Sequence, residues 1–138
     1  MFFNNDINQD KNSDLTKVAA LLIHAAKIDE DYSIEETEII KQALLKLGAD
    51  NLDLEKIIEE AKKIEQNSNQ ILEFTKEIKK MNYDNKIRII ETLWQIIYSN
   101  KEADIYETSL MRRLAGLLYI NNKIMGNIKE KIKKENSK

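Results

Sequence analysis

The chain has 138 residues, of which 42% are hydrophobic and 33% are charged, a balance typical of one globular domain. The formal net charge is −2 and no basic patch stands out in the body of the chain, so the composition argues against a nucleic-acid-binding protein. The absence of cysteine excludes disulfides, thiolate metal sites and cysteine nucleophiles. There is no proline and there are only three glycines, and this scarcity of turn residues favours long helices.

The first part of the chain predicts a flexible arm followed by a central helix. Residues 1–12 are mostly polar, and we expect them to form the arm ahead of a single domain at 13–134 and a short tail at 135–138. Ser13 or Asp14 can cap a helix over about 14–28. Residues 18–26 are apolar nearly all round, which is typical of a helix in the middle of a bundle.

Six further helices are expected along the chain. Apolar residues at helical spacing predict helices near 34–47, 53–66 and 69–80, and Gly48 suits the left-handed residue that ends the first of these. Asn82 or Asp84 opens a strongly apolar helix that ends near Ser99 and includes Trp94, which we expect in the core. Helices near 105–118 and 122–134 follow, so the sequence predicts an all-α fold of about seven helices without strands.

An internal repeat relates the two apolar helices and the loops after them. Each loop is acidic and opens a second helix, and equivalent positions are 71 residues apart. Four oxygen-bearing positions coincide, pairing Asp29 with Asn100, Asp31 with Glu102, Ser33 with Asp104, and Glu36 with Glu107. Two helix–loop–helix repeats of this kind predict a bundle with pseudo-two-fold symmetry.

The first interpretation of these loops is a divalent-cation site in each. Calcium and magnesium take several oxygen ligands, mostly carboxylates, converging from a turn. All eight paired positions are therefore candidate ligands, with calcium preferred because its coordination is tolerant and magnesium as the alternative. The loops are not EF-hands, because the sixth and twelfth positions from Asp29 are Ile34 and Ile40 rather than glycine and glutamate.

The second interpretation is that the loops are helix caps only. Ser33 and Glu36 have the spacing of a capping box, and Asp104 and Glu107 repeat it with aspartate at the cap. Acidic residues in a first turn are also stabilised by the helix dipole. Capping accounts for these four residues and leaves the other four as ordinary loop residues.

The repeated pattern resembles the TerB-like domain, a family named for tellurite resistance. The resemblance rests on the apolar helix, acidic loop and Ser/Asp-x-x-Glu helix start, found twice from about Leu15 to Ile120. It implies an all-α fold, a stress-response setting and a metal site with Asp29, Glu36, Asn100 and Glu107 as ligands. Glu30 and Lys101 stand where the family has glycine, and Asn100 where it has aspartate, so the first loop keeps more of the pattern.

The remaining polar residues favour binding over catalysis. His24, the only histidine, lies within an apolar helix, and we interpret it as a hydrogen-bonded residue of the core or its boundary, with a ligand or base as the alternative. No phosphate-binding glycine loop or nucleophile–base motif is present, so we expect a non-enzymatic protein that binds a cation, a protein partner, or both.

Sequence features near the two ends of the chain indicate whether membrane contact is expected. A lysine-rich segment at 129–134 favours a solvated helix face, with contact to an anionic membrane surface as the alternative. No leader or membrane-spanning run is apparent, and we expect a cytoplasmic location.

Overall fold

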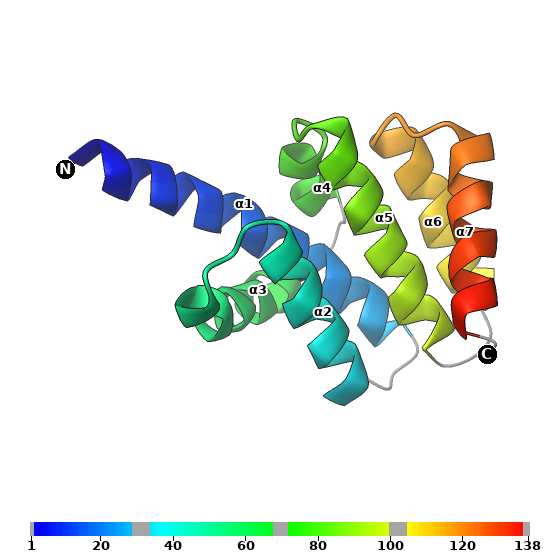
Figure 1. The fold of residues 1–138 in the computed structure, drawn as a ribbon, viewed down its shortest axis with the longest axis horizontal. Helices are drawn as coiled ribbons and strands as arrows, with labels where there is room; N and C mark the ends of the chain where they lie inside the picture. The colour runs from blue at the N-terminus through cyan, green and yellow to red at the C-terminus, as the bar shows by residue number, and fades with distance from the viewer. Residues whose placement is uncertain (1, 29–33, 68–71, 100–104, 137–138) are drawn as a thin grey trace.

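The structure is a computed structural model that describes residues 2–28, 34–67, 72–99 and 105–136. Over these residues the chain is all-α, as predicted, with seven α-helices, one short 3₁₀ turn and no strand (Figure 1). The elements are α1 (Phe2–Lys27), α2 (Ile34–Lys46), η1 (Asn51–Asp53), α3 (Leu54–Asn67), α4 (Leu72–Ile78), α5 (Tyr83–Tyr98), α6 (Ile105–Leu117) and α7 (Asn122–Asn136).

Two helices, α1 and α5, form the centre of the bundle. The α1 segment from Val18 to Ile23 is completely buried, and Ile89, Ile90, Leu93 and Ile97 of α5 are equally inaccessible. Helix α1 packs against α2, α3, α4 and α5, while α5 also packs against α2 and α7 (Figure 1). Burying a leucine or isoleucine side chain contributes about 1.5–3 kcal/mol, so this pair of helices supplies much of the driving force for folding.

Helix α1 is longer than the sequence pattern predicts, because it begins at Phe2 rather than near residue 14. No glycine or proline interrupts residues 2–27, and the Thr16 hydroxyl donates a hydrogen bond of 2.6 Å to the Asn12 carbonyl across the expected start. The N-terminal part of α1 extends beyond the helices that pack on it (Figure 1). The division into an arm at 1–12, a domain at 13–134 and a tail at 135–138 stays a prediction.

Helix boundaries follow the repeat found in the sequence. Helices α2 and α6 both contain 13 residues and start 71 residues apart, and α1 and α5 end at the same separation. This agreement shows that the local helix–loop–helix pattern occurs twice. The pseudo-two-fold symmetry of the whole bundle stays a prediction.

The ends of α2 and α6 also match, because both helices close with a Schellman motif. The Ala49 amide donates to the Leu44 carbonyl at 2.9 Å, and the Ile120 amide donates to the Ala115 carbonyl at 2.9 Å. The residue in the left-handed region is Gly48 (φ 106°) in the first motif and Tyr119 (φ 58°) in the second.

Basic side chains near the start of α5 connect these two helix ends. The Arg88 guanidinium donates to the Lys46 carbonyl at 3.0 Å, and the Lys86 ammonium donates to the Leu118 carbonyl at 3.5 Å. Positive charge at a helix C-terminus stabilises the helix dipole and satisfies carbonyls that have no partner within the helix. One helix therefore fixes where both α2 and α6 end.

Helix α7 docks on α5 through its apolar stripe and two of its lysines. The Trp94 indole N–H donates to the Met125 sulfur at 3.4 Å, and the Lys129 ammonium lies 5.7 Å from the Trp94 ring centroid. Lys131 pairs with Glu91 at 3.5 Å. Part of the lysine-rich segment therefore faces α5 and not the solvent alone. Within the described residues, no helix combines the length and apolarity that crossing a bilayer requires.

We expect Gly48→Ala to lower the free energy of unfolding by about 1–2 kcal/mol, because a Cβ is strained at this backbone conformation. The matched control is Gly116→Ala on α6, where an added Cβ meets nothing within 4 Å. Since alanine is the better helix former, this control should stabilise the protein by up to about 1 kcal/mol. Urea unfolding measures both, and equal effects of the two substitutions would contradict the assignment.

Candidate functional site

Two of the eight predicted site residues, Glu36 and Glu107, lie within the described part of the chain. They occupy equivalent positions in the first turns of α2 and α6. The other six lie outside the described residues: Asp29, Asp31, Ser33, Asn100, Glu102 and Asp104.

Glu36 and Glu107 are the two most deeply buried ionisable residues among those the structure describes, since each is only 1% exposed. Their neighbours Glu35 and Tyr106 are exposed, so adjacent positions of each first turn differ sharply in burial. Removing a carboxylate from water is costly unless hydrogen bonds or a positive charge replace the lost hydration. Both glutamates have at least one interaction partner.

The charge of Glu107 affects the pKa of Tyr98, at the end of α5. Burial raises the pKa of the Tyr98 hydroxyl, and the negative charges of Glu130 and Glu107 raise it further. The Tyr98 ring stacks on Trp94 with centroids 5.8 Å apart. Tyr98 therefore links Trp94, the only tryptophan of the chain, to the charge of Glu107 in the predicted second site.

The described residues alone do not complete a metal centre. Over the ranges that the structure describes, no three His, Asp or Glu side chains come together in a group that could hold a metal ion. Calcium takes six to eight oxygen ligands, so Glu36 and Glu107 suit a hard cation chemically but would need the remaining donors of their loops.

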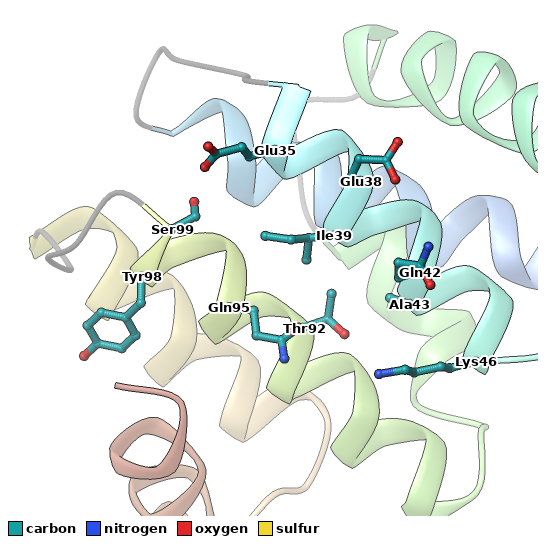
Figure 2. A pocket seen from close by; sticks show the side chains of 10 residues that line it. All are labelled: Glu35, Glu38, Ile39, Gln42, Ala43, Lys46, Thr92, Gln95, Tyr98 and Ser99. Atoms are coloured by element: carbon teal, nitrogen blue, oxygen red, sulfur yellow. The ribbon is translucent and has the colours of Figure 1, made fainter. Parts of the chain in front are cut away.

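A groove lies near the first turn of α2, between α2 and α5 (Figure 2). It has a volume of about 580 Å³. Figure 2 shows Ile39 and Gln42 on α2 opposite Thr92 and Gln95 on α5, with Glu35 and Glu38 towards one end and Lys46 towards the other. The acidic start and basic end of α2 complement its own dipole, so this charge pattern has a structural cause.

His24 occupies the edge of the core, as predicted. Its Nδ1 lies 3.3 Å from the Glu65 carboxylate, which also binds the Lys27 ammonium at 2.7 Å. The Nδ1–carboxylate distance is within hydrogen-bond range, and Nδ1 donates in the tautomer that carries the proton there. No local pattern in the sequence pointed to Glu65, because it lies on a different helix, 41 residues after His24.

Comparison with protein families identifies the family of this chain. The family model described as "Tellurite resistance protein TerB" matches residues 15–130, most of the chain. The chain belongs to the TerB family. Neither curated proteins nor solved structures give a match.

The TerB match includes both predicted loops and both buried glutamates. It begins within α1 and ends within α7, so every helix of the bundle contributes to the matched region. The earlier resemblance to this family is thereby confirmed, together with its all-α fold. The ligand set that the resemblance implies stays a prediction.

In this TerB domain, Glu107→Gln should lower the pKa of Tyr98, because the substitution removes one of the charges that raise it. The pKa should remain above 10, since burial is the largest cause of the shift. Glu130→Gln should lower it more, because Glu130 contributes more than Glu107. Ultraviolet titration measures the change, with Tyr98→Phe identifying the signal, and an unchanged pKa in both variants would contradict the described geometry.

Proposed function

We propose that this TerB domain binds a divalent cation through its two acidic loops, with Glu36 and Glu107 as the innermost ligands. The observation that carries the proposal is that both carboxylates are 1% exposed at equivalent positions of the repeat. The further ligands proposed for the first site are Asp29, Asp31 and Ser33. Those proposed for the second are Asn100, Glu102 and Asp104.

The burial of the two glutamates favours a cation site over a role in helix capping alone. A capping-box glutamate accepts a hydrogen bond from a backbone amide at the edge of a helix, which does not require removal from water. A cation adjacent to a buried carboxylate compensates its lost hydration more strongly than a neutral amide does. The same arrangement at both positions supports a shared binding role.

We propose calcium in preference to magnesium. Calcium accepts irregular sets of oxygen ligands, whereas magnesium requires near-octahedral geometry and gives up its water reluctantly. The first loop should bind more tightly, because the second contains Asn100 and Lys101, which lower its negative charge. We further propose a non-catalytic role in a cytoplasmic stress response, since the family description names tellurite resistance.

Calcium at about 100 times its dissociation constant should stabilise the folded domain by about 2.7 kcal/mol and raise the melting temperature by roughly 10 °C. Glu36→Gln and Glu107→Gln should each reduce this shift, because each removes a charged ligand. Glu35→Gln is the matched control, since it makes the same chemical change one position away on an exposed side chain. Thermal unfolding with and without millimolar calcium measures the shift, and an unchanged melting temperature would remove the proposal.

Trp94 fluorescence should distinguish the two loops. Neutralising Glu107 with a bound cation changes the electrostatic environment of Tyr98, which stacks on Trp94 at 5.8 Å. We therefore expect a saturable emission change on calcium addition that persists in Glu36→Gln and disappears in Glu107→Gln. A signal that survives Glu107→Gln would assign the second site to other ligands.

The second candidate function is a helical protein-interaction module whose acidic loops are only caps. The groove between α2 and α5 favours it, together with Ile34, which is 85% exposed at the start of α2. This function requires no cation. A purified partner should bind more weakly to Ile39→Arg, which fills the groove with charge, while Lys63→Ala on α3 should bind normally.

A further inference from the structure

A second concave surface lies between the end of α1 and one face of α6. It has a volume of about 530 Å³, within the range of about 300–1,000 Å³ that is usual for small-molecule sites. The residues that line it are His24, Ile28, Tyr106, Ser109, Leu110 and Arg113.

Hydrogen-bond donors gather on the α6 side of this surface. Tyr106, Ser109 and Arg113 lie three and four residues apart, which places them on one face of the helix. Across the described residues, none of these three side chains has a hydrogen-bond or ion-pair partner, and no carboxylate lines the surface. Arg113 thus has no counterion among the described residues, in a chain whose net charge is negative.

The α1 side adds a histidine whose position is fixed. Glu65 is only 10% exposed and holds His24 through Nδ1, while Lys27 binds the other carboxylate oxygen at 2.7 Å. Lys27 therefore offsets the charge of the carboxylate that contacts His24. Between the two polar sides, Ile28 and the buried Leu110 provide apolar contact.

From this arrangement we infer a site for a small organic anion, in which a carboxylate or phosphate group is attached to an apolar body. Arg113 would bind the anionic oxygens, because a guanidinium matches carboxylate and phosphate geometry with two parallel hydrogen bonds. Ser109 and Tyr106 supply further donors, and Ile28 and Leu110 contact the apolar body. The site uses none of the proposed cation ligands, so it is independent of the proposed function.

Titration with phenyl phosphate and with benzoate tests the site. Amide chemical shifts monitor binding, and a metal chelator is present throughout. The chelator excludes a cation that bridges protein and probe. We expect saturable shifts around α6 and the end of α1 with at least one probe, and the stronger probe identifies the preferred anion. Benzyl alcohol, which has the apolar ring without the charge, should bind at least about tenfold more weakly.

Arg113→Gln should weaken binding of the preferred probe by about tenfold or more, because it removes a charge-assisted interaction. Arg112→Gln is the matched control, since Arg112 is an exposed neighbour on the same helix that does not line the surface. Circular dichroism and thermal unfolding should show that both variants are folded. The inference is overturned if neither probe gives saturable shifts, or if the two arginine substitutions have equal effects.

Discussion

The structure depends on the burial of two helical segments, residues 18–26 of α1 and residues 89–98 of α5. Residues 18–26 of α1 have no polar face apart from His24, so other helices must cover them all round. Helix α5 is buried over most of its surface, keeps a polar face that includes Arg88, Glu91 and Gln95, and shares an interface with α1. Helices α2, α3, α4 and α7 pack against this central pair.

This constraint also explains why a first-turn glutamate becomes buried in each half. Helices α2 and α6 begin a few residues after α1 and α5 end, so their first turns lie close to the central pair. Arg88 and Lys86 fix the opposite ends of the same two helices at 3.0 and 3.5 Å. In α6 the outcome is two faces of opposite chemistry, with the Glu107 carboxylate inside and the donors of Tyr106, Ser109 and Arg113 outside.

The sequence predicted helix positions well, because apolar spacing and caps are local properties. Asn82 caps α5 as expected, accepting a hydrogen bond from the Asn85 amide at 2.8 Å, and α2 and α6 end within one residue of their predicted limits. The start of α1 was misplaced because Ser13 and Asp14 are good caps, yet no residue before them stops the helix. Tyr119 in the left-handed region also escaped prediction, since glycine is the usual signal.

For the candidate sites too, features that depend on local spacing were predicted, and features that depend on tertiary packing were not. The repeat identified Glu36 and Glu107 from spacing alone, but their burial depends on tertiary packing and became evident only in the structure. Contacts between distant segments, such as His24 with Glu65 or α1 with the Arg113 face of α6, have no local signature. His24 and Arg113, on helices far apart in the chain, therefore gave no indication in the sequence of a shared surface.

The central claim is that the two buried glutamates belong to cation sites and are more than caps. Equilibrium dialysis against radioactive calcium tests it most directly, because it counts bound ions without relying on a change in stability. The account predicts up to two calcium ions per chain, bound with unequal affinity, and close to none in the Glu36→Gln, Glu107→Gln double variant. Equal calcium binding by the wild-type protein and the double variant, or none by either, would contradict it.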